Sequence, residues 1–175
     1  AGNTTLLFLE LCEKLNGSVI SVDIKDRSKL FDKRNWSFIH SEDLNIDNIK
    51  KYIENMSFDI ICLDTIHTKN HVKKMIGIYY KFLKVGGIFL IDGTSHIPYL
   101  KNNYRDNFYS EINNQEIFNY LLSLYNNEKN EIKLDFSFKG SGVARITKKK
   151  DTLLKEKKII SRKKSLKNYI RELID

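Results

Sequence analysis

The 175 residues of this chain are enough for one α/β domain of ordinary size with a real hydrophobic core. Apolar residues make up 41% of the sequence, which excludes a largely disordered chain, and no stretch approaches the roughly 20 uncharged apolar residues of a membrane span. The net charge of +8 is uneven, because residues 148–175 hold 11 Lys and Arg against 4 Asp and Glu, so the rest is close to neutral.

Helical and strand patterns alternate along the chain. Apolar residues at helical spacing predict four helices, over residues 4–15, 46–55, 72–83 and 114–125. Short β-branched or apolar runs predict six strands, over residues 18–24, 37–40, 58–64, 87–92, 132–138 and 143–146. The strands over 18–24 and 58–64 are typical of strands buried on both faces, and residues 27–35 suggest an irregular connection with one or two helical turns.

This alternation predicts an α/β fold with a doubly wound, mostly parallel, Rossmann-like sheet. The glycines of Lys139-Gly140-Ser141-Gly142 join the last two strands in a predicted antiparallel hairpin at the C-terminal end of the sheet. Gly86-Gly87 is predicted to close the third helix. We expect residues 1–147 to form one domain and residues 148–175 a basic, helical C-terminal extension.

The two cysteines, Cys12 and Cys62, lie in apolar patterns and are predicted to be small buried side chains. A disulfide framework is therefore not expected, and no signal peptide is visible. Both features favour a cytoplasmic protein.

Acidic and polar residues follow the ends of four predicted strands. They are Asp23, the run His40-Ser41-Glu42-Asp43, the run Asp64-Thr65-Ile66-His67, and Asp92-Gly93-Thr94. Ligands of open α/β sheets bind outside the carboxyl ends of the strands. The sequence therefore predicts a site at this edge.

A second signal lies at the start of the chain, where Gly2-Asn3-Thr4-Thr5 opens the first helix. A glycine before a helix N-terminus allows a ligand to approach, and the free N–H groups favour carboxylate or phosphate oxygens. Asp23, at the end of the next strand, can accept hydrogen bonds from two ribose hydroxyls. The alternative is that Asp23 only caps the following turn.

These motifs resemble the class I S-adenosylmethionine-dependent methyltransferases. They are most similar to the small-molecule O-methyltransferase group whose fourth strand ends Asp-Gly-x-His and whose fifth follows a Gly-Gly turn. The matching stretches are FDIICLDTIHTKNHV, FLKVGGIFLIDGT, the GNTT start and the KGSGVARI hairpin, within residues 1–148. Two features differ: the first strand and the start of the Gly-rich loop would lie before Ala1, and Thr65 stands where that group often has Gly.

The resemblance implies S-adenosyl-L-methionine as cofactor and gives roles to individual residues. Gly2, Asn3 and Thr4 would border its methionine end, Asp23 would hold the ribose, and Glu42 or Asp43 would lie near the adenine. Asp64 would sit beside the sulfonium and the acceptor.

Some members of that group bind a divalent metal through the acids that end the fourth and fifth strands, here Asp64 and Asp92. Two carboxylates with waters suit Mg²⁺, which would orient an acceptor hydroxyl and lower its pKa. His67 or Asp64 could remove the hydroxyl proton. A capping or supporting role for His67 is an equal alternative.

Other polar residues are weaker candidates. His96 is expected on a surface loop, His71 pointing outward from its helix, and His40 packing at a strand end. Residues 97–109 hold aromatic side chains and an arginine that could stack on an acceptor or simply pack on the sheet.

The leading interpretation is methyl transfer to a hydroxyl of a small molecule or glycan. The alternatives are an RNA methyltransferase, a nicotinamide-dependent dehydrogenase and a non-catalytic Rossmann-like module. The basic extension could pack on the domain or on a partner subunit in a homo-oligomer, contact nucleic acid, or bind an anionic membrane surface.

Overall fold

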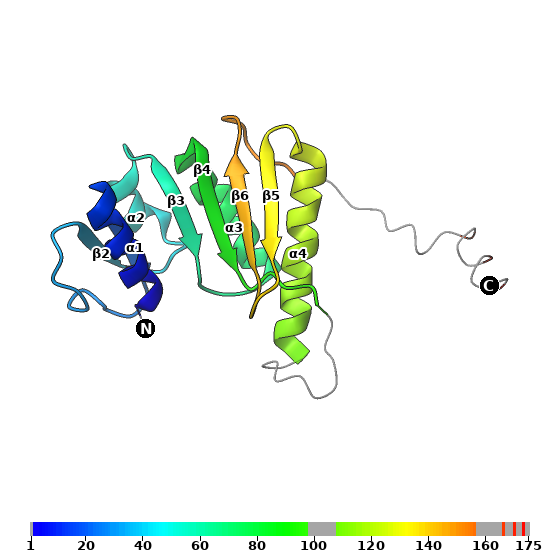
Figure 1. The fold of residues 1–175 in the computed structure, drawn as a ribbon, viewed down its shortest axis with the longest axis horizontal. Coiled ribbons are helices and arrows are strands. Elements are labelled where there is room, and N and C mark those ends of the chain that lie inside the picture. Colours follow the sequence, from blue (N-terminus) through cyan, green and yellow to red (C-terminus); the bar gives the residue numbers. More distant parts are fainter. Residues whose placement is uncertain (1, 98–107, 157–165, 167–169, 171–172, 174–175) are drawn as a thin grey trace. The chain divides into compact units, whose positions relative to one another are not determined.

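The computed structural model describes residues 2–97 and 108–156, with residues 166, 170 and 173 (Figure 1). The chain divides into two compact units, Ala1–Ser57 (unit 1) and Phe58–Asp175 (unit 2). No helix among the described residues is long and apolar enough to cross a membrane.

Unit 1 is a pair of parallel strands with two helices: α1 (Asn3–Leu15), β1 (Val19–Asp23), β2 (Trp36–His40) and α2 (Ile46–Ile53). The register places Asp23 beside His40, so both strands end at the same edge. Asn45 begins α2 by accepting a hydrogen bond from the Asn48 N–H. The small core of the unit consists of Leu9, Ile39, Ile49 and Ile53.

Unit 2 contains a mixed four-stranded sheet in the order β3-β4-β6-β5 (Figure 1). Its elements are β3 (Phe58–Leu63), α3 (Lys69–Tyr79), the 3-10 turn η1 (Tyr80–Phe82), β4 (Leu83–Asp92), α4 (Phe108–Glu128), β5 (Ile132–Ser137) and β6 (Val143–Lys148). β3 and β4 run parallel, whereas β6 is antiparallel to both β4 and β5. Helices α3 and α4 contact each other.

The whole is an α/β protein, as the sequence pattern predicts. The strands form two sheets among the described residues, and β1 pairs there only with β2 and β3 only with β4. The strands expected to be buried on both faces are therefore partly open. β1 is half-buried along its length, and most of β3 is half-buried or exposed, which corrects that expectation.

Some helix and strand boundaries differ from those predicted from the sequence. Gly86-Gly87 does not close a helix but lies inside β4, where the pairing with β3 shifts register between Phe58 and Ile60, and Gly86 takes a φ of 85°. Residues 27–35 form turns without a helix, and α4 begins six residues earlier than the pattern at residue 114 indicates. Most of the predicted basic extension lies outside the described residues.

Candidate functional site

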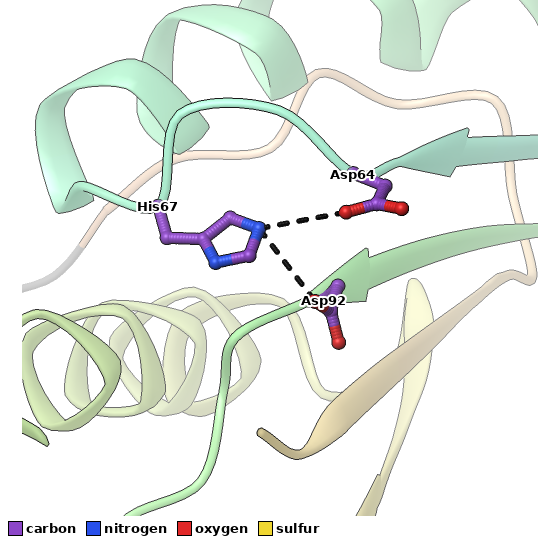
Figure 2. A group of neighbouring side chains, drawn as sticks. All are labelled: Asp64, His67 and Asp92. Atoms are coloured by element: carbon purple, nitrogen blue, oxygen red, sulfur yellow. Dashed lines mark ion pairs between the residues drawn. The ribbon is translucent and has the colours of Figure 1, made fainter. Parts of the chain in front are cut away.

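Two carboxylates and one imidazole meet at the end of the parallel strand pair β3–β4. Asp64 directly follows β3, Asp92 ends β4, and His67 lies in the connection to α3. Figure 2 shows the His67 ring directed toward both acids; its Nε2 lies 3.7 Å from Asp64 Oδ1 and 3.6 Å from Asp92 Oδ2. One donor atom from each residue fits within 4.8 Å of the others. The sequence predicted that Asp64 and Asp92 would share an edge, and here they do.

His67 approaches the acids because its neighbours leave room for the ring. Gly93 has a φ of 71°, and a Cβ there would lie 2.7 Å from His67 Nδ1, so any larger residue would displace the imidazole. The Nε2 atom is shielded from solvent and has no hydrogen-bond partner among the described residues. An unsatisfied ring nitrogen between two carboxylates can hold a proton or contribute to a cation site.

The β3–α3 connection is fixed by hydrogen bonds of its own. The Thr65 hydroxyl lies 3.0 Å from Nε2 of His71, and Thr68 begins α3 by accepting a hydrogen bond from the His71 N–H. His71 is buried, which corrects the expectation that it points outward: its ring faces back toward Thr65. Thr65 therefore has a structural use in this connection.

Cys62 also departs from expectation. It is exposed rather than buried, because β3 has a strand neighbour on one edge only within the described residues. Although the residue is exposed, partial burial of its thiol, together with the negative charges of Asp64 and Asp92, raises the thiol pKa to about 11. The thiol consequently stays protonated at neutral pH and is a poor nucleophile.

Unit 1 holds a separate hollow beside Asp23. Its lining comes from the start of α1, from β1 and β2, and from the connection between these two strands. The lining residues are Gly2, Thr5, Ser21, Val22, Asp23, Arg27, Leu30, Trp36 and Phe38. Gly2 precedes α1 with a φ of 87°, and a Cβ there would lie 2.5 Å from Leu30 Cδ2. The lining therefore combines polar groups, among them Thr5 and Asp23, with the aromatic rings of Trp36 and Phe38.

Asp23 already makes two contacts within its own turn. Its Oδ1 accepts the Lys25 N–H at 2.8 Å, and Oδ2 lies 3.7 Å from Arg27 Nε. The turn-capping role is thus present, and it coexists with a place in the lining of the hollow. A ligand hydroxyl would share the carboxylate with these groups.

The other residues predicted to contact the cofactor are placed less directly. Asn3 and Thr4 are exposed and do not line the hollow, whereas Thr5 does. Glu42 and Asp43 follow β2 at the edge where Asp23 ends β1, but neither lines the hollow.

Trp36 and Phe38 were not identified from the sequence as candidate site residues. Their alternation with Ser37 on β2 is the signal that could have indicated one shared face, which carries both rings. The Trp36 indole N–H donates to the Ser21 hydroxyl on the neighbouring strand at 3.1 Å, which orients the ring.

Two further histidines differ in their surroundings. His40 is exposed and its Nε2 lies 2.9 Å from the Ile24 carbonyl, so it does not pack at the strand end as expected. His96 is exposed, as expected, and stacks on Phe118 with 4.3 Å between ring centroids. The aromatic acceptor segment proposed over 97–109 lies largely outside the described residues.

Solved structures share this fold. The MycE methyltransferase from the mycinamycin biosynthetic pathway, in complex with Mg and SAH, superposes with a TM-score of 0.57 at 20% identity; 77% of this chain matches 37% of that one. A Staphylococcus aureus protein assigned as a caffeoyl-CoA O-methyltransferase has a TM-score of 0.56 at 14% sequence identity. The match covers 83% of this chain and 82% of that one. A Clostridium thermocellum protein assigned as an rRNA methylase has a TM-score of 0.59 at 18% sequence identity. The match covers 86% of this chain and 83% of that one.

No model of a known protein family matches the sequence, and no curated protein sequence does. The chain spans 37% of the length of MycE, so it corresponds to one part of that protein. At these identities the likeness establishes the fold of class I methyltransferases.

Proposed function

We propose that this chain carries out S-adenosylmethionine-dependent methyl transfer to a hydroxyl group of a small molecule or glycan. The observation that supports this most is the shared fold with methyltransferases solved with SAH, combined with acids at the ends of β1, β3 and β4. When bound, S-adenosylmethionine supplies an electrophilic methyl group.

In this proposal the residues of unit 1 bind the cofactor. Asp23 accepts hydrogen bonds from the ribose, Gly2, Asn3 and Thr4 border the methionine end, and Glu42 or Asp43 lies near the adenine. The hollow beside Asp23 supports the assignment of the ribose and the methionine end, because Asp23 and Gly2 both line it. The sequence assigns these roles by resemblance, and the structure adds Thr5, Trp36 and Phe38 as further candidates.

In unit 2, His67 and Asp64 are the proposed catalytic residues, with Asp64 beside the reacting sulfonium. His67 Nε2 makes no hydrogen bond within the described residues, so its lone pair can take the proton of the acceptor hydroxyl. The carboxylates 3.6 and 3.7 Å away would stabilise the charge that the ring gains. The oxygen would then be free for in-line attack on the methyl carbon, with cleavage of the carbon–sulfur bond and S-adenosylhomocysteine as the leaving group.

Asp64 and Asp92 are also the proposed ligands of a divalent cation. The fit is supported by the two carboxylates, whose oxygens lie within 4.8 Å of each other and of the His67 ring. Mg²⁺ held there would orient an acceptor hydroxyl and lower its pKa.

Calorimetric titration of the chain with S-adenosylhomocysteine tests the proposal. Asp23→Ala should weaken binding about tenfold to a hundredfold, because hydrogen bonds to a charged group contribute about 1.5–3 kcal/mol. Asp26→Ala is the matched control, since Asp26 lies in the same connection but outside the hollow. A longer form of the chain, extended at its N-terminus, should be titrated in parallel; no binding by either form would refute the methyltransferase proposal.

RNA is a second candidate acceptor. The rRNA-methylase likeness and the 11 basic residues within 148–175 favour it. Removal of residues 157–175 tests this and spares Lys148, which is buried in β6, and Glu156, which pairs with Lys73 at 2.6 Å. An anchoring role predicts weaker RNA binding with a shallower salt dependence; unchanged binding would exclude it.

A further inference from the structure

The hairpin turn between β5 and β6 approaches the acid cluster from a distant part of the sequence. Ser141 Oγ in this turn donates a 2.8 Å hydrogen bond to Asp92 Oδ1, 49 residues away along the chain. The other carboxylate oxygen, Oδ2, is the one that faces His67. The two oxygens of Asp92 therefore have different partners.

The turn that carries Ser141 is held on several sides. The Ser141 carbonyl accepts the Ser95 N–H at 2.9 Å and the Asn114 side-chain amide at 3.3 Å. The Thr94 N–H donates to the Gly142 carbonyl at 3.1 Å, which extends the β4–β6 pairing beyond Asp92. Gly142 has a φ of 85°, and a Cβ there would collide with the Ser95 backbone.

These contacts fix the place of the hydroxyl relative to the end of β4. Asp92 pairs directly with Val143 in the antiparallel register, so the backbone that carries the carboxylate is joined to the strand that follows the turn. The Asp92 side chain is 28% exposed, against 57% for Asp64, and it is the more strongly held of the two acids. A carboxylate with one oxygen already bonded has fewer orientations to lose when its second oxygen binds a ligand.

We propose that Ser141 is a positioning residue, which by engaging Oδ1 of Asp92 holds Oδ2 ready to bind a divalent cation. This inference rests on the cation role of Asp64 and Asp92 in the proposed function. Neighbours that orient a ligating carboxylate raise metal affinity without touching the metal. Ser141 would act in that way from the β5–β6 turn.

Mn²⁺ titration of the full chain, followed by the loss of the free-ion EPR signal, measures this directly. Ser141→Ala should weaken Mn²⁺ binding about tenfold, at the low end of the range for such neighbours, because the hydrogen bond is exposed to solvent. Ser141→Thr keeps the hydroxyl and should restore binding to within about twofold. Ser137→Ala, on the other side of the turn, is the control and should leave affinity unchanged.

Urea unfolding of the same variants separates positioning from a purely structural role. If Ser141 only stabilised the turn, Ser141→Ala would lower the free energy of unfolding and leave Mn²⁺ affinity unchanged, which would overturn the inference. Asp92→Asn should lose Mn²⁺ binding, and retention of binding by this variant would overturn the inference, because Asp92 would not be a ligand. If the unaltered chain bound no Mn²⁺, the cation site and this inference would both fall, whereas the S-adenosylhomocysteine titration would still decide methyl transfer.

Discussion

The two units of this chain differ in how much apolar surface they bury. Four apolar side chains are buried in unit 1 and sixteen in unit 2, counted over the described residues. Helix α1 leaves Leu6, Leu7, Leu11 and Leu15 between 40% and 70% exposed. Because an amphipathic helix is stabilised mainly by packing of its apolar face, unit 1 should be the weaker part.

The candidate sites follow the same division. The hollow assigned to the cofactor belongs to the unit with the small core, and the acid cluster belongs to the unit with the large one. Binding of the cofactor should therefore change the stability of unit 1 more than that of unit 2.

The largest expected difference between the units is in the free energy of unfolding lost when a leucine is replaced by alanine in each of them. Leu121→Ala, at a fully buried position in α4, should cost about 2–5 kcal/mol of the free energy of unfolding. Leu7→Ala, at a position 66% exposed in α1, should cost less than about 0.5 kcal/mol. Urea denaturation measures both; equal costs would show that the leucines of α1 are covered in solution.

A second effect should appear when S-adenosylhomocysteine is added. At a concentration of 100 times Kd it should stabilise the bound state by about 2.7 kcal/mol, which slows exchange of the amides of β1 roughly a hundredfold. Hydrogen-exchange mass spectrometry would report it, with Asp23→Ala as the variant that loses the protection. Protection confined to unit 2 would contradict the assignment of the cofactor to unit 1.

Lys148 should make a smaller contribution to unit 2. Its side chain is 2% exposed, and its ammonium donates to the Leu83 carbonyl at 2.8 Å and pairs with Asp151 at 2.6 Å. Lys148→Met keeps most of the side-chain volume but loses the charged hydrogen bond, and should cost about 1.5–3 kcal/mol. Lys139→Met, in the exposed β5–β6 turn, is the control, and a loss of equal size there would argue against a special role for Lys148.

The smallest effect is a dependence on alkaline pH. Burial raises the pKa of Tyr80 and of Tyr120 well above the ordinary value of 10.0. Above about pH 10 the unfolded chain gives up these protons and the folded chain keeps them, so stability should fall by up to about 1.4 kcal/mol per pH unit for each. Below pH 9 neither should matter.

Tyr80→Phe should make that fall less steep in urea unfolding between pH 9 and 11. Because the Tyr80 hydroxyl has no hydrogen-bond partner among the described residues, the substitution should cost little at pH 7. An unchanged slope would show that the hydroxyl reaches solvent.

Periodicity was enough to place most of the elements. The helix predicted at 46–55 and the strand at 18–24 differ from α2 and β1 by no more than two residues at either end, because local spacing of apolar residues determines both. Gly86-Gly87 was misread because a glycine pair looks the same at a helix end and in a bulged strand. The burial of β3 was misjudged because it depends on strand neighbours that a short segment does not reveal.

The candidate site was predictable only where strand ends mark it. Asp64 and Asp92 follow from the parallel pairing of β3 and β4, since the carboxyl ends of parallel strands share an edge. Ser141 does not follow from any local signal, because its link to Asp92 arises when the β5–β6 hairpin folds back beside β4. Gly93 likewise shows its importance only once the ring of His67 is in place.

The enclosure of Lys148 also makes this side chain a chemical reporter. A reagent that acylates free amines needs an accessible, deprotonated nitrogen, whereas the buried Lys148 ammonium lies over the ring of Tyr80 and donates to the Leu83 carbonyl. Exposed lysines such as Lys139 would be modified from the folded state, whereas Lys148 would be modified only when unit 2 opens. Mass spectrometry of a labelling time course would then follow the opening of unit 2 through a single native residue, with no added probe.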